Sequence, residues 1–231
     1  MKILCVIPAR AGSKGLKNKN IQKIKGKTLI EITCKVALRS KLFEDIIVST
    51  DSKKYLGYTK ILKRKTPYLR PHNLSGDKIS DLKLIRHELK VYEKFFKKKY
   101  DFVALLQPTC PLRRIQHLKD CYKILKVKKC DAVWTVSEIS LKYNHLKQLE
   151  IKNGRLGYCN KNGSKIIARQ QLKRTFIRNG AAYFFSRKTI LNYKKILPKK
   201  TYYKIITDKL INIDNKEDLR SAQKYLSSSN S

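Results

Sequence analysis

The sequence predicts a single α/β domain with a mainly parallel β-sheet, and three features support this prediction. The chain opens with a short apolar run, residues 3–7, of the kind found in buried parallel strands. Two more apolar runs, residues 46–50 and 100–106, each end in a polar loop, and helical patterns separate the runs. Because such folds bind ligands at the carboxyl edge of the sheet, the loops after these strands are the places to search for a site.

Length and composition indicate a globular protein. The 231 residues suffice for one large domain with a substantial core. No stretch approaches the roughly 18 consecutive apolar residues of a membrane helix, and the opening apolar run is too short for a signal peptide. The six cysteines lack Cys-x-x-Cys spacing, which is typical of reduced, buried thiols. We therefore expect a cytoplasmic protein that has no disulfide framework, no zinc site and no membrane partner.

The charge is strongly positive: 54 Lys and Arg residues against 17 Asp and Glu residues give a formal net charge of +37. Such a charge alone suggests binding to nucleic acid or to an anionic membrane. The lysines are, however, spread over nearly every segment, and no known nucleic-acid motif accompanies them. Ile, Lys, Asn and Tyr are all abundant, as an AT-rich coding sequence would produce. We interpret the charge as compositional drift on solvated faces and expect no specific nucleic-acid partner.

The loop after the first apolar run, residues 8–20, has the composition of a phosphate-binding loop. Gly12 and Gly15 allow backbone conformations that turn N–H groups inward. It has neither the Gly-Lys-Ser/Thr ending of a Walker loop nor the Gly-x-Gly-x-x-Gly spacing of a dinucleotide site. The alternative is a basic turn that only faces solvent. We rank it lower because the glycines and the preceding strand lie where backbone N–H groups would have to bind a phosphate. The segment also supplies three cations and one amide: Arg10, Lys14, Lys19 and Asn20.

Further elements follow along the chain. Helices are predicted over residues 29–39, 80–92, 115–127, 186–193 and after residue 214, and strands over residues 131–136, 179–185 and 210–214. We expect a short helix and a weak third strand within residues 53–64, and a frayed tail over residues 227–231. Residues 138–178 are polar, with turn signals at two Asn-Gly pairs, which indicates an excursion from the sheet.

Three motifs, found in order along the chain, resemble those of the acylneuraminate cytidylyltransferases. This family, also called CMP–sialic acid synthetases, includes relatives that act on legionaminic and pseudaminic acids. The motifs are Pro-Ala-Arg-Ala-Gly-Ser-Lys-Gly at residues 8–15 with Lys19-Asn20, Leu-Leu-Gln-Pro-Thr-Cys-Pro-Leu-Arg at residues 105–113, and Asn-Gly-Ala-Ala-Tyr-Phe-Phe at residues 179–185. Cys110 stands where serine is common in the family. The resemblance extends from Pro8 to Leu219.

The resemblance implies a Rossmann-like nucleotidyltransferase domain over residues 1–231, with residues 138–178 as a dimerisation excursion and a homodimer as the assembly. It implies a reaction in which CTP and a nonulosonic acid give a CMP-sugar and pyrophosphate, in the biosynthesis of cell-surface polysaccharide or lipopolysaccharide. The anomeric hydroxyl of the sugar would attack the α-phosphorus directly, and the base that takes its proton is not identified. Two alternatives stay open: a Kdo-type or other sugar nucleotidyltransferase, which the wording of the motifs disfavours, and a non-catalytic nucleic-acid-binding protein.

The same resemblance implies roles for individual residues. Mg²⁺ would bind Asp214 and Asn212. The family's best-known members carry Asp-x-Asp at this point, so Asn212 offers an oxygen but no charge. The other roles are catalytic for Arg10, Lys14, Lys19 and Asp214; nucleotide-binding for Ala9, Arg10, Asn20, Arg70 and Ser80; and sugar-binding for Gln107, Lys147, Arg169 and Tyr183.

Structural interpretations remain open for three polar residues. Asp51 follows the second apolar run and either touches a nucleotide or caps the next short helix. Ser80 either caps the long helix that follows it or lies near the nucleotide, and one residue could do both. His117 is expected on the surface of its helix.

Overall fold

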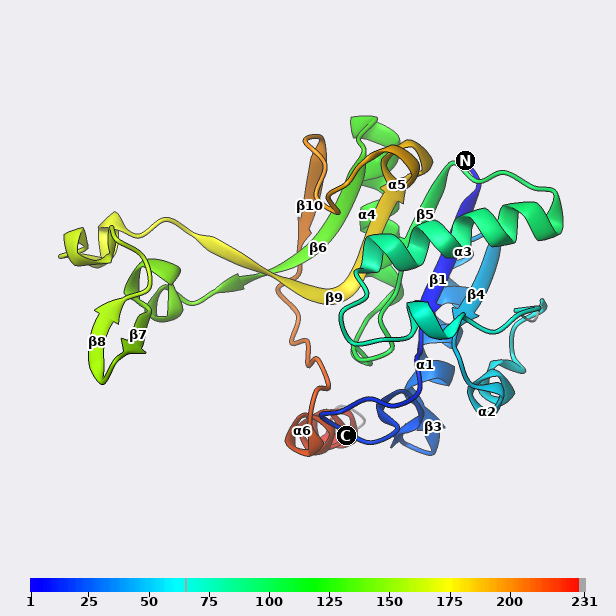
Figure 1. Cartoon of the computed structure of the whole chain (residues 1–231), viewed down its shortest axis with the longest axis horizontal. Coiled ribbons are helices and arrows are strands. Elements are labelled where there is room, and N and C mark those ends of the chain that lie inside the picture. The colour runs from blue at the N-terminus through cyan, green and yellow to red at the C-terminus, as the bar shows by residue number, and fades with distance from the viewer. Residues whose placement is uncertain (65, 229–231) are drawn as a thin grey trace. The chain divides into compact units, whose positions relative to one another are not determined.

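A six-stranded, mostly parallel sheet forms the centre of the computed structural model, which describes residues 1–64 and 66–228 (Figure 1). The strand order is β10-β6-β9-β5-β1-β4. β1 pairs in parallel with both β4 and β5, and β9 pairs antiparallel with β5. The predicted α/β fold is therefore confirmed. The strands are β1 (Ile3–Pro8), β4 (Asp45–Ser49), β5 (Phe102–Leu105), β6 (Ala132–Ile139), β9 (Thr175–Ser186) and β10 (Thr201–Ile205).

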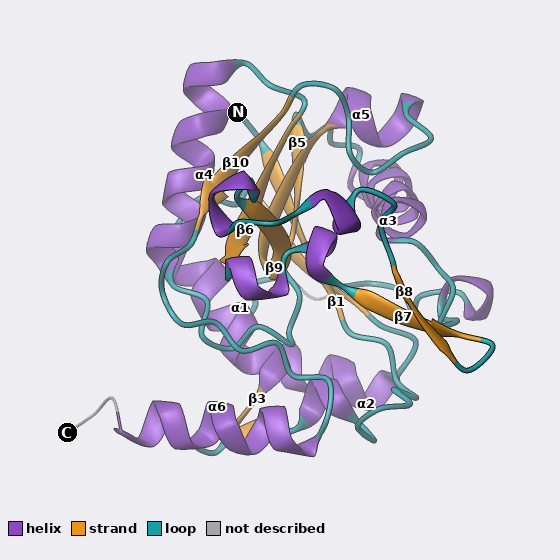
Figure 2. Cartoon of the chain, turned by 90° about the vertical axis from the view of Figure 1, so that its left-hand side faces the viewer, coloured by secondary structure: helices purple, strands orange, loops and turns teal. Residues whose placement is uncertain are grey.

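Helices cover both faces of the sheet (Figure 2). Because successive strand residues point to opposite faces, β1 contributes to two separate clusters of buried side chains. Ile3, Cys5 and Ile7 pack on the side of α1 and α4. Leu4 and Val6 pack on the side of α3 and α5. The helices are α1 (Leu29–Ser40), α3 (Asp81–Phe96), α4 (Ile115–Lys128) and α5 (Arg187–Asn192).

A third apolar cluster supports the loop that follows β1. Leu16 from this loop packs with Ile24, Leu29, Ile213 and Ala222, all of them buried. Ala222 belongs to α6 (Lys216–Ser228), and Ile24 belongs to a small hairpin of β2 (Lys23–Ile24) and β3 (Lys27–Thr28). The cluster therefore fixes the residue before Asp214 against the loop, although some 200 residues of chain separate them.

The contacts divide the chain into two compact units. The first consists of residues 1–135, 179–204 and 208–228, and the second of Val136–Arg178 with Ile205–Thr207. The second unit contains a two-stranded sheet of β7 (Leu149–Lys152) and β8 (Arg155–Tyr158). Its long segment nearly coincides with the predicted excursion of residues 138–178, whose role in dimerisation stays a prediction.

Some predictions of secondary structure are wrong. Residues 210–214 run as an irregular segment, in which Ile213 N donates to Thr109 O at 2.8 Å. Residues 53–64 hold α2 (Lys53–Leu56) and a 3₁₀ turn instead of a third strand. β10 was not predicted, because its Thr-Tyr-Tyr-Lys-Ile sequence is half exposed at the edge of the sheet. Ser227 and Ser228 continue α6, and residues 229–231 of the expected frayed tail lie outside the described residues.

Within the described ranges, no helix combines the length and the apolar character that crossing a membrane would require.

Candidate functional site

A pocket of about 460 Å³ opens in the first unit at the carboxyl ends of β1 and β5. Its wall combines the loop after β1, the turn before α3 and the residues that follow β5. The structure thus brings together predicted residues from four separate segments of the chain. Those that line the pocket are Arg10, Lys14, Lys19, Asn20, Arg70, Gln107 and Asp214.

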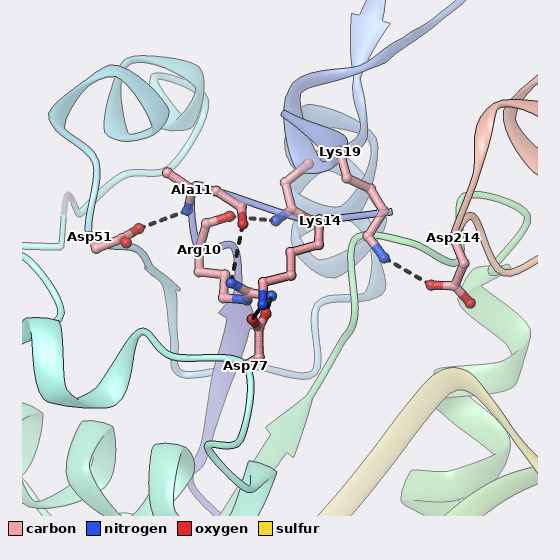
Figure 3. Close-up of polar contacts among 9 residues, drawn as sticks. Arg10, Ala11, Lys14, Lys19, Asp51, Asp77 and Asp214 are labelled. Carbon is pink, nitrogen blue, oxygen red and sulfur yellow. Dashed lines mark hydrogen bonds and ion pairs between the residues drawn. The ribbon is translucent and has the colours of Figure 1, made fainter. Parts of the chain in front are cut away.

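Two hydrogen bonds shape the loop of residues 9–20, which we call the basic loop (Figure 3). Ala11 N donates to the carboxylate of Asp51 at 2.7 Å, and Asn20 Nδ2 donates to Arg10 O at 3.0 Å. Gly12 adopts a φ of 73°, which a residue with a Cβ rarely tolerates. Asp51 therefore holds the basic loop, whereas the residue at the N-cap of α2 is Ser52.

Three cations of the basic loop, Arg10, Lys14 and Lys19, are each paired with a carboxylate from a distant segment (Figure 3). Arg10 and Lys14 both contact Asp77, the latter at 3.0 Å, and Lys19 Nζ contacts Asp214 Oδ1 at 2.8 Å. The hydrogen bond from Lys14, together with the charge of Arg10, lowers the pKa of Asp77. The side chains of Lys14 and Asp214 remain largely exposed, so both ion pairs can exchange partners.

Arg70 is held by a buried network rather than by an exposed ion pair. Its Nε donates to Ser49 Oγ at 2.9 Å, and its Nη2 donates to Ser49 O. Ser49 Oγ in turn donates to Glu88 at 2.7 Å, and Tyr68 donates to the other oxygen of Glu88 at 2.7 Å. Burial lowers the pKa of Arg70, and the nearby charge of Glu88 opposes that shift. Glu88, fully buried on α3, therefore offsets the charge of Arg70 and fixes the Ser49 hydroxyl to which Arg70 donates.

Arg113, the last residue of the second motif, fixes the wall that carries Gln107. The guanidinium is buried and donates to the carbonyls of Gln107, Gly180 and Ala181. It thereby ties the end of β5 to β9. Gly180 has a φ of 71°, and a Cβ placed there would lie 2.9 Å from both Gln107 Oε1 and Asn212 Oδ1. Both amide side chains thus lie close to Gly180, whose positive φ also favours glycine.

Four predicted residues belong to the first unit but do not contribute to the described lining. Ala9 is buried, and its N–H donates to Ser49 O at 2.8 Å. Ser80 is the N-cap of α3, and its side chain accepts a hydrogen bond from Lys83 N, as expected for a residue that caps the helix. Tyr183 is buried and accepts a hydrogen bond from Gly180 N at 2.7 Å. Asn212 is exposed beside Gly180. Their functional roles stay predictions.

Lys147 and Arg169 belong to the second unit, where both side chains are exposed. They line a pocket of about 520 Å³ within that unit, together with Lys142 and a set of apolar side chains that includes Leu149 and Ile167. The surface is cationic and apolar at once, which suits an organic anion.

The donor set fits a magnesium ion in part. Asp214 lines the first unit's pocket and is 76% exposed, and Mg²⁺ is often held by one or two carboxylates together with phosphate oxygens and water. Among the described residues, no group of three or more His, Cys, Asp or Glu side chains could hold a metal ion. The metal ligands predicted from the sequence therefore supply one carboxylate, that of Asp214, and the neutral oxygen of Asn212 two residues before it.

Sequence reasoning missed several residues that organise the site. Asp77 and Glu88 act over long distances in the sequence, and only folding brings them to their partners. The Leu-Ser-Gly-Asp turn that carries Asp77 was the available signal, because it closely follows Arg70. His117 was expected on the surface and is 4% exposed, because its Nε2 lies 2.8 Å from Asp208.

Gly15→Ala tests the contact between the basic loop and the segment of Asp214. A Cβ at Gly15 would lie 2.7 Å from Asp214 O, a backbone atom that cannot easily move, whereas a Cβ at Gly57 would meet nothing within 4 Å. We expect Gly15→Ala to lower the free energy of unfolding by about 1–3 kcal/mol in urea titrations. Gly57→Ala is the matched control and should change it little. Equal effects of the two substitutions would contradict the close approach.

Glu88→Ala tests the network of Arg70. Removing the carboxylate leaves a buried guanidinium without its negative partner, which we expect to cost about 3 kcal/mol of unfolding free energy. Tyr68→Phe removes one hydrogen bond to the same carboxylate and should cost about 1 kcal/mol. Urea denaturation of the two variants measures the difference. A Glu88→Ala protein as stable as Tyr68→Phe would show that Glu88 does not compensate the buried charge of Arg70.

Comparisons with known proteins show the family to which the chain is similar. A family model described as cytidylyltransferase matches residues 4–228. The chain is 31% identical to the N-acylneuraminate cytidylyltransferase of Streptococcus agalactiae serotype III, over 94% of this chain and 52% of that protein. It is 32% identical to the CMP-N,N'-diacetyllegionaminic acid synthase of Legionella pneumophila, over 87% of this chain and 85% of that protein. The chain thus spans about half the length of the streptococcal relative.

The fold has solved counterparts. CMP:2-keto-3-deoxy-manno-octonic acid synthetase, solved in complex with CTP, superimposes with a TM-score of 0.71 at 16% identity, over 99% of this chain and 100% of that chain. At this identity the likeness shows the fold alone. The family model, which matches nearly the whole chain, confirms the resemblance indicated by the three motifs: the chain belongs to the cytidylyltransferase family.

Proposed function

We propose that the protein transfers CMP from CTP to a nonulosonic acid, a sialic acid or a legionaminic or pseudaminic relative, and releases pyrophosphate. One observation carries the proposal: Arg10, Lys14 and Lys19, all from the loop after β1, line a single pocket at the carboxyl edge of the sheet. Backbone amides and cations gathered at such an edge suit a triphosphate. The sequence identity to enzymes named for N-acylneuraminate and diacetyllegionaminic acid supports the choice of acceptor.

In this proposal, some residues of the pocket bind the phosphates and others bind the nucleoside. Arg10, Lys14 and Lys19 offset the charge of the triphosphate and of the pyrophosphate as it leaves. Arg70 and Asn20, which the fold holds rigidly, bind the nucleotide, with Ala9 and Ser80 as neighbouring contacts. The hydroxyl oxygen of the sugar forms the new bond to the α-phosphorus while the bond to the pyrophosphate oxygen breaks. Catalysis then rests on positioning and on charge neutralisation, without a covalent enzyme intermediate.

Sugar binding is proposed separately for residues of each unit: Gln107 and Tyr183 in the first, and Lys147 and Arg169 in the second. Gln107 lines the first unit's pocket, and its backbone is fixed by Arg113. Tyr183 supports the neighbouring turn through its bond to Gly180. In the second unit, the cationic lining of Lys147 and Arg169 supports a role in holding the sugar's carboxylate.

Mg²⁺ is part of the proposal, with Asp214 as its carboxylate ligand and Asn212 as a neutral oxygen donor. When bound, the ion would neutralise charge on the phosphates. Lys19, which contacts Asp214 at 2.8 Å, would share that carboxylate with the ion.

The panel of acceptors that tests this function is small. Purified protein is incubated with CTP and Mg²⁺ and with N-acetylneuraminate, diacetyllegionaminate, pseudaminate or Kdo, and pyrophosphate release is measured. We expect release with at least one of the three nonulosonic acids and little with Kdo. Release with Kdo alone would favour the Kdo-type alternative, and release with none of the acids would refute the proposed function.

Arg10→Ala should lower turnover of the preferred acid by about 10²–10³-fold, because it removes a fixed donor from the developing charge. Lys17→Ala is the matched control: Lys17 is an exposed cation of the same loop that does not contribute to the described lining of the pocket. It should leave turnover within about two-fold of the wild type. Equal rates for the two variants would remove Arg10 from the mechanism.

A homodimer and a cytoplasmic location complete the proposal. The second unit exposes several large apolar side chains, among them Ile151 at 74% and Ile167 at 92%, which supports a protein contact on this unit. All six cysteines are free thiols, five of them buried, which suits a reducing compartment.

Light scattering with the double variant Ile151→Lys and Ile167→Lys tests the dimer. We expect the wild type to have the mass of two chains and the variant that of one. The control is Ile61→Lys, which changes an apolar side chain in the first unit that is 50% exposed. A wild type that is monomeric at micromolar concentration would overturn the dimer without touching the chemistry.

A further inference from the structure

Asp77 occupies an unexpected place for an acidic residue. It lies in the turn between the 3₁₀ helix His72–Leu74 and α3, and it lines the pocket that the basic loop borders. Its two carboxylate oxygens contact two different cations: Oδ1 contacts Arg10 Nη2, and Oδ2 contacts Lys14 Nζ at 3.0 Å. Figure 3 shows both cations turned toward this one side chain.

The nitrogen atoms that hold Asp77 are the same atoms that would hold a phosphate. A carboxylate and a phosphate oxygen are alternative acceptors for charged N–H donors, so each weakens the hold on the other. A negative carboxylate beside a bound phosphate also repels it. Competition for the donors and charge repulsion both lower the affinity of the basic loop for an anion.

Asp77 differs in this respect from Glu88, the acid that offsets the charge of Arg70 in the pocket wall. Glu88 is fully buried beside Ser49 and Arg70, so it is a permanent part of the wall. The Asp77 side chain is 39% exposed, and that of Lys14 is 84% exposed, so their contact can open at little cost in free energy.

We propose that Asp77 is a competing counter-ion that limits the affinity of the basic loop for phosphate anions and thereby sets how fast pyrophosphate leaves. The proposal rests on the proposed function, in which pyrophosphate is the product. CTP carries a nucleoside that other parts of the pocket hold, whereas pyrophosphate depends on the cations alone. Asp77 weakens the binding of both ligands to the basic loop. Pyrophosphate therefore dissociates readily, whereas CTP stays bound through the contacts of its nucleoside.

Asp77→Asn separates charge from shape, because the amide keeps an acceptor oxygen in the same place. We expect Asp77→Asn to bind inorganic pyrophosphate roughly ten-fold more tightly in calorimetric titrations. Inhibition of turnover by added pyrophosphate should strengthen by a similar factor. Asp77→Glu keeps the charge and should behave like the wild type. The difference between Asp77→Asn and the wild type should shrink at high salt, because salt screens exposed charges.

Glu44→Gln is the matched control. Glu44 pairs with Lys98 at 2.6 Å outside the pocket, so the substitution makes the same change in net charge and also removes an ion pair. It should leave the affinity for pyrophosphate unchanged. If it tightens binding as much as Asp77→Asn does, the effect is one of net charge and the role of Asp77 is refuted.

Circular dichroism verifies that Asp77→Asn is folded, and Asp77→Ser takes its place if it is not. Equal or weaker pyrophosphate binding by the folded variant would overturn the role of Asp77 even if the wild type turns over CTP. A wild type that releases pyrophosphate with none of the acids would refute the proposed function instead, so the two failures can be told apart.

Discussion

The positively charged side chains that line one pocket repel each other, and each of them has a negatively charged partner that offsets this repulsion. Arg10 and Lys14 share Asp77, Lys19 pairs with Asp214, and Arg70 reaches Glu88 through Ser49. The partners come from segments far apart in the chain, so the charges are balanced only in the folded protein. This balance explains why a pocket suited to a polyanion contains carboxylates.

The partners differ in burial, and the difference divides the pocket into a fixed wall and an exchangeable one. Glu88 is enclosed between β4 and α3, and taking it from Arg70 would leave a charge in the core. Asp77 and Asp214 are partly or largely exposed, and solvent screens their ion pairs. Under the proposed function, the side of the pocket assigned to the nucleotide would keep its shape, while the side assigned to the phosphates would change partners during the reaction.

The sequence predicted what depends on local pattern. Short apolar runs located β1, β4 and β5, because a strand buried on both faces is apolar throughout. The glycines and cations of residues 8–20 located the loop, where Gly12 has a positive φ. Seven predicted residues from four segments proved to line one pocket, since the carboxyl ends of parallel strands meet at one edge.

What the sequence could not supply is pairing between distant segments. In the sequence, Asp77 has the pattern of an ordinary turn residue and Glu88 that of an exposed glutamate on an amphipathic helix. Only the folded structure shows that Asp77 contacts Arg10 and that Glu88 accepts a hydrogen bond from Ser49. His117 was misplaced for the same reason, because its partner Asp208 is 91 residues away. The stretch of residues 210–214 has the alternation of a strand, but it runs as an irregular segment whose Ile213 is buried against Leu16 and Ala222, with Ile211 partly buried against the same cluster. Local pattern does not distinguish that anchor from a strand.

The most direct test of the central claim is a crystal structure of the protein soaked with CTP. The account predicts phosphate oxygens within hydrogen-bond distance of the side chains of Arg10, Lys14 and Lys19, with the carboxylate of Asp77 turned away from the first two. Phosphates bound elsewhere, or Asp77 still paired with Arg10 and Lys14 beside a bound triphosphate, would contradict it.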